Sequence, residues 1–377
     1  SVVLICGLCC AGIGFVSIQL AGFCLIPGEI LLMCYEKLCV LAGAVPFCTW
    51  IGGAPKIWRC VIYYVILLGG IQAALFLREK EECRVRRFLP RGICVAVVCV
   101  SILILGFRQR GELLITCLDI GQGDGIVIQL PGGKTVMVDG GSSSKKKVAS
   151  YQILPYLKNQ GISVVDAMLI SHTDLDHISG VQELLTLKEK HLTTLHIKNL
   201  LLPDWKAPEE VYYELEDQAK RCGISVLRLH QGQKLRFGDG SLEILSPETD
   251  AKGTDVNEEG IVMELRYGKF RGLFTGDIGV ETEKKLLPKL DDVNFLKVGH
   301  HGSRYSTCQE FLDKIKPELA VISCSESNTY GHPSPETTAR LEENGIQTEC
   351  TMKSGAVTVY TDGHSMRMKT FCNEKTA

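Results

Sequence analysis

Two cysteine arrangements that would decide the class of protein are missing from this sequence of 377 residues. Paired CxxC motifs would indicate a thiolate zinc site, and a regular framework would indicate a small disulfide-linked domain. The six cysteines beyond residue 111 show neither pattern; they are Cys117, Cys222, Cys308, Cys324, Cys350 and Cys372. The sequence therefore indicates neither class, although structural disulfides stay open in an oxidising environment.

The larger, C-terminal part of the chain also lacks an excess of positive charge. Residues 1–111 contain 11 Lys and Arg against 5 Asp and Glu, whereas residues 112–377 contain 30 against 38. A tight nonspecific binder of duplex nucleic acid depends on phosphate contacts from Lys and Arg, so the acidic balance argues against that class. No internal repeat is visible either, which argues against a solenoid. The two balances indicate two different environments.

Long uncharged stretches are confined to the first part of the chain. They cover residues 1–28, 38–55, 60–77 and 92–107. A membrane-spanning helix needs roughly 17 to 25 residues, so the first three are long enough and the fourth is marginal, with Arg91 and Arg108 able to snorkel from its ends. A signal peptide is the alternative for the first stretch only, and no cleavage site followed by a soluble domain comes next. We predict that residues 1–110 are transmembrane helices of a multi-pass plasma-membrane protein, with further helices upstream of Ser1.

The orientation follows from the loop at residues 78–91, which carries six Lys and Arg and should stay in the cytoplasm. If residues 92–107 cross the membrane, residues 111–377 lie outside the cytoplasm. Arg108 and Arg110 on the outer flank argue mildly against this orientation. The alternative is a re-entrant or interfacial segment that leaves the C-terminal domain in the cytoplasm.

The second part alternates between strand and helix patterns. We expect strands at residues 113–118, 125–130, 135–138, 167–170 and within 235–275, and helices at 178–187, 209–222 and 335–344, the last capped by Ser334. Alternating blocks of this kind predict a four-layer α/β sandwich.

The segment SHTDLDHISG at residues 171–180 is the most informative motif. His172, Asp174, Asp176 and His177 occupy six consecutive positions on a predicted strand-to-helix turn. Two carboxylates this close together raise the pKa of at least one of them unless a cation is present, and a divalent metal removes the conflict. The alternative is a solvated acidic turn with incidental histidines.

Further candidate ligands follow predicted strands later in the chain. They are Asp277 in LFTGDI, His300 and His301 in LKVGHHGS, and His332 in NTYGHPSP. A single histidine would more often be structural, but several strand-end candidates after an Asp-rich loop favour a metal site. His191, His196, His230 and His364 have no such setting, and we expect them to be surface or packing residues.

The order LDIGQGDG (118–125), VMVDGG (136–141), SHTDLDH, TGDI, HHGS and YGHP resembles the metallo-β-lactamase-fold domain of ComEC-type DNA-uptake channel proteins, over about residues 112–372. The resemblance implies an αβ/βα four-layer sandwich at residues 111–377 that faces outward. It also implies a role in natural competence, with incoming single- or double-stranded DNA as the partner. The implied reaction is phosphodiester cleavage of the DNA strand that is not imported. Membrane lipid and other DNA-uptake proteins are the implied partners.

We assign His172 and Asp174 to one divalent ion and Asp176 and His177 to the other, with Asp277 bridging them. At least one of His300, His301 and His332 should complete the second ion; we favour His301 and His332, but the sequence does not order them. Asp176, Asp277 and His332 are the candidate catalytic residues. Two such ions activate water and polarise the phosphoryl group.

Two departures from the resembled pattern affect the site. Asp174 stands where the wider superfamily commonly has histidine, so the ligand set is richer in oxygen and suits manganese or magnesium as well as zinc. In DVNEEGI, residues 255–261, Asn257 matches the ComEC pattern but Gly260 replaces its usual serine, which puts one first-shell or phosphate-orienting contact in doubt.

Two other functions stay open. The domain could be a non-catalytic part of the channel that guides the DNA strand, or an exported phosphoesterase that acts on a small ester. Lys145, Lys146 and Lys147 could lie near the mouth of the site, but a solvated charge run explains them equally simply. An intact ligand set favours catalysis, and the apolar helices argue against a simple secreted esterase.

Overall fold

The computed structural model describes residues 2–44, 49–79, 89–106 and 111–372 of the chain. The chain divides into two compact units, Ser1–Trp50 and Ile51–Ala377. The domain boundary predicted between residues 110 and 111 lies inside the second unit and borders residues outside the described ranges, so it stays a prediction.

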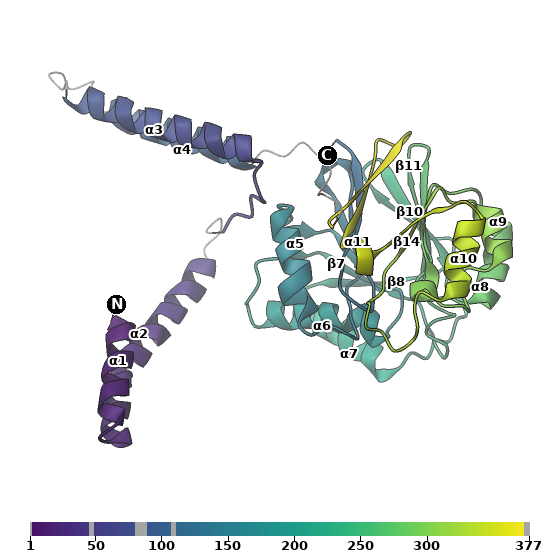
Figure 1. Cartoon of the computed structure of the whole chain (residues 1–377), viewed down its shortest axis with the longest axis horizontal. Helices are drawn as coiled ribbons and strands as arrows, with labels where there is room; N and C mark the ends of the chain where they lie inside the picture. The colour runs from purple at the N-terminus through teal and green to yellow at the C-terminus, as the bar shows by residue number, and fades with distance from the viewer. Residues whose placement is uncertain (1, 45–48, 80–88, 107–110, 373–377) are drawn as a thin grey trace. The chain divides into compact units, whose positions relative to one another are not determined.

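The first unit contains α1 (Val2–Gly14) and α2 (Ile18–Ala44), which pack against each other (Figure 1). Residues 1–28 were expected to form one span, but the chain turns at residues 15–17, where the Ser17 hydroxyl accepts a hydrogen bond from the Leu20 amide at 3.4 Å. The expected span at residues 38–55 is also wrong as a separate helix. Its first residues end α2, and residues 49–56 are not helical, because Gly52, Gly53 and Pro55 disfavour a helix there.

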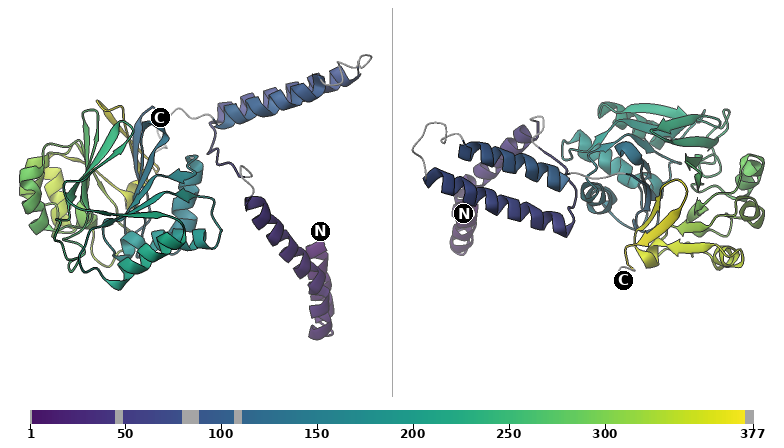
Figure 2. Two further views of the ribbon diagram at one scale, coloured as in Figure 1. Left: turned by 180° about the vertical axis from the view of Figure 1, so that it is seen from behind. Right: turned by 90° about the horizontal axis from the view of Figure 1, so that it is seen from above.

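The next two apolar stretches form helices as predicted. Residues 60–77 lie in α3 (Ile57–Glu79), and residues 92–106 lie in α4 (Leu89–Gly106), which packs along α3 (Figures 1 and 2). Within the described residues, α2 and α3 are long and apolar enough to cross a membrane, whereas α1 and the apolar part of α4 are shorter. Residues 80–88 of the basic loop, on which the predicted orientation depends, lie outside the described ranges.

Two sheets form the centre of the remaining chain (Figure 2). The eight-stranded sheet has the order β17 (Met366–Thr370), β16 (Val357–Thr361), β1 (Leu113–Cys117), β2 (Gly125–Gln129), β3 (Thr135–Asp139), β5 (Ala167–Leu169), β7 (Asn199–Pro203) and β8 (Ser225–Leu229). The seven-stranded sheet has the order β15 (Gln347–Cys350), β14 (Leu319–Ile322), β13 (Phe295–Lys297), β12 (Phe270–Phe274), β11 (Val262–Tyr267), β10 (Gly240–Ser246) and β9 (Lys234–Phe237). A short pair, β4 (Val164–Val165) and β6 (His196–Ile197), forms a separate two-stranded sheet.

Helices cover the outer face of each sheet, and three hydrophobic cores separate the layers. One core packs α5 (Leu154–Asn159), α6 (Leu175–Glu189) and α7 (Glu210–Arg221) on the first sheet, and a second fills the space between the sheets. The third packs α8 (Val280–Leu286), α9 (Gln309–Ile315) and α10 (Pro335–Glu343) on the second sheet, where the short α11 (Thr351–Ser354) follows β15. The predicted αβ/βα four-layer sandwich is therefore confirmed.

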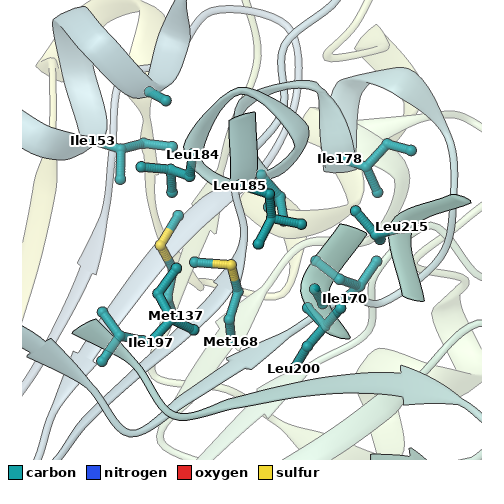
Figure 3. Packing of buried hydrophobic residues seen from close by; sticks show 14 of the residues in the cluster. Met137, Ile153, Met168, Ile170, Ile178, Leu184, Leu185, Ile197, Leu200 and Leu215 are labelled. Carbon is teal, nitrogen blue, oxygen red and sulfur yellow. The ribbon is translucent and has the colours of Figure 1, made fainter. Parts of the chain in front are cut away.

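The packing of α6 positions the metal motif. Its buried side chains recur at three- and four-residue spacing, so Leu184 and Leu185 meet Met137 of β3 and Met168 of β5 (Figure 3). Truncating one such leucine to alanine would cost about 2 to 5 kcal/mol of stability. This core holds the first turn of α6 against the ends of β3 and β5.

Most local predictions agree with the structure. The strands at residues 113–118, 125–130 and 135–138 correspond to β1, β2 and β3, and the Ser334 hydroxyl caps α10 by accepting from the Thr337 amide at 3.2 Å. One boundary was wrong: α6 begins at Leu175 instead of residue 178. Asp176 and His177 therefore lie in the first helical turn and not in a loop.

Candidate metal centre

The candidate ligands lie where strands of both sheets end. His172 follows β5, and β5 runs parallel to β3, which ends at Asp139. Asp277 follows β12, and His300 and His301 follow the parallel neighbour β13. Parallel strands end at the same edge of their sheet, so these side chains come together although they are far apart in sequence.

His177 is held between two carboxylates. Its Nδ1 lies 3.0 Å from Oδ2 of Asp139, and its Nε2 lies 3.4 Å from Oδ1 of Asp277. His172 stands beside it, with ring centroids 4.0 Å apart and its own Nδ1 at 3.0 Å from the Ser171 hydroxyl. Both imidazoles are fully buried, and because Nδ1 of each has a partner, Nε2 is left to face the space that they share with Asp277.

His301 approaches the same space from the other sheet. Its Nδ1 donates to the carbonyl oxygen of Ser323 at 2.9 Å. Its Nε2 lies 3.3 Å from Oδ2 of Asp277 and 3.4 Å from Oδ2 of Asp176. Asp277 thus faces His177 with one oxygen and His301 with the other, as a bridging carboxylate requires.

Four of these ligand atoms are buried without a hydrogen-bond partner: Nε2 of His172, His177 and His301, and Oδ1 of Asp277. Buried polar atoms without partners cost free energy, and a divalent cation would satisfy all four. Ligand atoms lie within 4.8 Å of one another in two sets that share His177. One set is His172, His177 and Asp277, and the other is Asp176, His177 and His301. The residues present therefore fit divalent metal ions.

The structure groups these residues differently from the sequence assignment. His172 joins His177 and Asp277, whereas Asp174 belongs to no close donor set among the described residues. Asp174 occupies the N-cap position of α6 without capping it, is about half exposed, and lies 3.7 Å from Nε2 of His172. The pairing of His172 with Asp174 on one ion stays a prediction.

His300 and His332 form the rim of the site. His300 is one-third exposed, with Nε2 at 3.9 Å from Oδ2 of Asp277. The His332 ring lies 5.7 Å from that of His300 and 6.5 Å from that of His301, and its Nδ1 is buried without a partner. Neither histidine belongs to a close donor set in the described part of the chain. The four histidines expected to be structural are also absent from these sets: His191, His196, His230 and His364.

The carboxylates and imidazoles of the cluster shift one another's pKa values. Burial lowers the pKa of His301, but the carboxylates of Asp277 and Asp124 outweigh burial and raise it to about 10. The pKa of His177 also rises well above its usual value, because Asp277 and Asp139 overcome the effect of burial. Burial and the neighbouring His301 and His300 lower the pKa of His332 to about 4, which leaves this imidazole neutral at pH 7.

Comparison with known proteins places this site in a family. The model of the metallo-beta-lactamase superfamily matches residues 118–326, more than half of the chain. The chain belongs to the metallo-β-lactamase superfamily. The matched range contains every candidate ligand except His332, which lies six residues beyond its end.

The relatives of this superfamily member include competence proteins. ComE operon protein 3 of Bacillus subtilis is 28% identical over 281 residues, which are 71% of this chain and 35% of the relative. Recombination protein 2 of Haemophilus influenzae is 30% identical over 266 residues, 70% of this chain and 31% of the relative. The chain thus spans about a third of the length of these relatives. They confirm the resemblance to ComEC-type competence proteins.

Among solved structures, the metallo-β-lactamase-fold protein YhfI from Bacillus subtilis is similar to this chain, with a TM-score of 0.48 and 12% sequence identity. The similarity covers 66% of this chain and all of that protein.

Sequence reasoning missed the residues behind the ligands of this metallo-β-lactamase-fold site. Asp139 accepts hydrogen bonds from the amide and hydroxyl of Ser171, both at 2.7 Å, as well as from Nδ1 of His177. Such outer-shell bonds fix the tautomer and orientation of a ligating histidine. The signal that could have revealed Asp139 is its place at the end of the apolar run VMVD, directly before two glycines.

A buried ion pair was also missed. Lys297 Nζ lies 2.8 Å from Oδ2 of Asp124, and both side chains are almost fully buried. The other oxygen of Asp124 lies 3.7 Å from Nδ1 of His301. Lys297 ends a short apolar strand, where a charged side chain has no explanation except a buried partner.

The backbone around the ligands is strained in a way typical of functional sites. Asp139, His300 and His301 have φ values of 54°, 47° and 53°, a left-handed region that costs residues other than glycine of order 1 to 3 kcal/mol each. Gly276 before Asp277 also has positive φ, and a side chain there would meet the Cβ of Ser171 at 3.2 Å. Glycine at position 276 therefore lets the backbone before Asp277 approach Ser171 closely.

The departure at Gly260 has a steric explanation. A Cβ atom at this position would lie 3.1 to 3.3 Å from the carbonyl oxygens of Asn257, Ser171 and Val256. The neighbouring Ile261 amide donates to the Ser171 oxygen at 2.8 Å, so this loop packs tightly behind the first metal motif. A serine would crowd the backbone here.

Proposed function

We propose that residues 111–377 form a metal-dependent phosphodiesterase that acts on DNA, as part of a membrane protein for DNA uptake. The observation that carries the proposal is the set of four buried, partnerless ligand atoms from His172, His177, His301 and Asp277. A relic domain would have no reason to retain such costly atoms around one space.

In this proposal two divalent ions, manganese or zinc with magnesium as a third candidate, supply Lewis acidity and a water nucleophile at neutral pH. The residues of the chain do the rest. Asp277 and Asp176 hold the cluster together from two elements, and Asp139 keeps the imidazole of His177 in the tautomer that leaves Nε2 free. The neutral His332 at the rim offers one N–H to a phosphoryl oxygen.

The substrate argument combines relatives and surface chemistry. Curated relatives are named as competence and recombination proteins, which supports DNA as the substrate. Next to the site, Tyr330 is 65% exposed and stacks on His332, with ring centroids 5.7 Å apart and planes 22° apart. An exposed aromatic face suits an unstacked base, worth about 1 to 3 kcal/mol per stacked base. The acidic balance of the domain agrees better with a single strand than with a gripped duplex.

The proposed placement is in the plasma membrane with the metal domain outside the cytoplasm. The six basic residues at 78–91 support a cytoplasmic loop after the candidate span α3. The placement then requires residues 92–107, most of which lie in α4, to cross the membrane. A protease added to intact protoplasts should digest an epitope placed after Ala377 and spare one inserted at residues 79–82. Survival of the C-terminal epitope until the membrane is permeabilised would place the domain in the cytoplasm and exclude degradation of the non-imported strand.

Two alternatives make different predictions in one assay. The full chain in detergent is stripped of metal, reloaded with manganese, zinc or magnesium, and given single-stranded DNA, duplex DNA and a small phosphodiester in parallel. We expect metal-dependent cleavage that is fastest on single-stranded DNA and absent in Asp277→Ala. Cleavage of the small diester alone would support the phosphoesterase, and metal binding without cleavage would support the strand-guiding domain.

A further inference from the structure

Two cysteines of the second sheet lie in contact. The sulfur atoms of Cys324 and Cys350 are 3.2 Å apart, although the residues are separated by 25 others. Cys350 is the last residue of β15, and Cys324 follows the end of the adjacent parallel strand β14, whose Ile322 is paired with Cys350. The pairing of β14 with β15 therefore holds the two free thiols in contact.

We propose that Cys324 and Cys350 are a modification site at which a disulfide bond forms under oxidising conditions. A disulfide needs a sulfur–sulfur distance of about 2.05 Å, so the sulfurs must approach by roughly 1 Å, which small side-chain rotations provide. The cysteines of this domain show no disulfide spacing in sequence, because the pairing arises from strand order and not from a local motif.

The environment makes the two thiols unequal. Cys324 is fully buried, with its sulfur 3.8 Å from that of Met352, whereas Cys350 is partly exposed. A pocket of about 590 Å³ is lined by Cys350, Pro333, Thr338 and Lys353. A small reagent can therefore reach Cys350 but not Cys324.

The electrostatics agree with this order of reaction. The contact with Cys324 and, more weakly, the charge of Lys353 lower the pKa of the Cys350 thiol, while the same contact and burial raise the pKa of Cys324. The thiolate is the reactive form of cysteine, so Cys350 is the first nucleophile.

The oxidant in this scheme is a small disulfide or the disulfide of a thiol oxidase. The Cys350 thiolate attacks one of its sulfurs, and the other sulfur leaves as a thiolate that takes up a proton. Cys324, on losing its proton, then attacks the Cys350 sulfur of the mixed disulfide and displaces the second half of the oxidant as a thiol. The two cysteines lose two electrons and two protons, and the oxidant becomes two thiols.

The bond would brace a segment that supports the metal site. Ser323, directly before Cys324, accepts the Nδ1 hydrogen of His301 with its carbonyl and donates its hydroxyl to the Gly123 oxygen at 2.7 Å. The bond would also close a loop that contains His332. Closing a loop of this length in a domain of this size should raise the thermal unfolding midpoint by roughly 5 to 10 °C.

The test uses the full chain in detergent and does not depend on its activity. Reduced protein is incubated with oxidised glutathione, its free thiols are alkylated, and tryptic peptides are analysed by mass spectrometry. Cys324 and Cys350 fall on separate peptides, residues 315–340 and 341–353. We expect these two peptides to be joined in most molecules, and to separate on reduction.

The matched variants are Cys350→Ser and Cys222→Ser. Cys222 lies on the other sheet's helical layer, where its thiol donates to the Leu185 oxygen. Oxidation should raise the unfolding midpoint, followed by the fluorescence of the buried Trp205, in wild type and Cys222→Ser but not in Cys350→Ser. Glutathione that remains on Cys350, or full alkylation of both cysteines after oxidation, would overturn the proposal in the wild-type chain itself.

Discussion

The candidate ligands fall into a buried set and a rim set, and the two differ in how their atoms are held. In the buried set, Nδ1 of His172, His177 and His301 each has a protein partner, so Nε2 is aimed at one space. In the rim set, Asp174 and His300 are partly exposed and more than 3.5 Å from their nearest oppositely charged partners in the site. The difference teaches that a histidine is oriented for metal binding when its Nδ1 is hydrogen-bonded to the protein and its Nε2 is left free. Sequence spacing alone does not reveal this.

The largest expected effect is at Asp277, which faces both halves of the buried set. In Asp277→Ala, bound metal should fall from about two ions per chain to one or none. Hydrolysis should fall by more than about 100-fold, because even the loss of an outer-shell partner typically costs 10- to 100-fold. Metal analysis and turnover of single-stranded DNA measure both. Turnover like that of wild type would contradict the dinuclear site.

His300 and His301 give the sharpest test of the comparison, because they are neighbours with the same left-handed backbone. Asparagine tolerates this conformation, so His301→Asn and His300→Asn are matched variants. We expect His301→Asn to lose about 100-fold in activity and His300→Asn to lose less than about tenfold. Equal losses of activity in the two variants, measured in the same assay, would contradict the distinction between buried and rim ligands.

Asp139 tests whether the outer shell prepares the buried set. Asp139→Asn keeps the shape of the side chain but removes the charge that orients His177, so metal affinity should fall about 10- to 100-fold. Asp119→Asn is the control, since the Asp119 side chain is only partly buried and pairs only with Lys145 among the charged residues described. Metal titration measures the metal affinity of both variants. An unchanged metal affinity in Asp139→Asn would show that Asp139 does not prepare the site for metal binding.

The smallest expected effect concerns the choice of metal at the rim. The stripped chain should regain more activity with manganese than with zinc at equal free concentration, because the ligand set is rich in oxygen. Asp174→His should shift that preference back toward zinc by a few-fold. An unchanged preference in this variant would show that Asp174 is not a ligand.

The sequence could predict the helix and sheet layers and the candidate metal ligands because both depend on short patterns of neighbouring residues. Apolar periodicity marked the strands, and the strand-end positions of His172, Asp277 and His301 are visible as short runs before polar residues. It could not predict contacts that depend on strand order. The bond between Asp139 and His177 joins the end of β3 to the first turn of α6, and the pair of Asp124 and Lys297 joins the two sheets across 173 positions.

Element boundaries were the other weak point. Asp176 and His177 in the first turn of α6 are polar and were expected in a loop, so the helix was predicted to begin at residue 178 and not at Leu175, although Asp174 is of a type favoured at an N-cap. The predictions for the apolar stretches near the N-terminus failed for a different reason: absence of charge shows where a helix can be buried in lipid but not where it ends, since α2 continues through Pro27 whereas the chain turns at residues 15–17. Residues 38–55 are the clearest case.

The most direct test of the account is a metal titration of the stripped full chain, with bound ions and cleavage of single-stranded DNA measured in the same samples. We predict that cleavage stays near background with one ion per chain, rises as the second ion binds, and is removed again by a chelator. Full cleavage with no bound ion, or two bound ions without any cleavage in the wild-type chain, would contradict it.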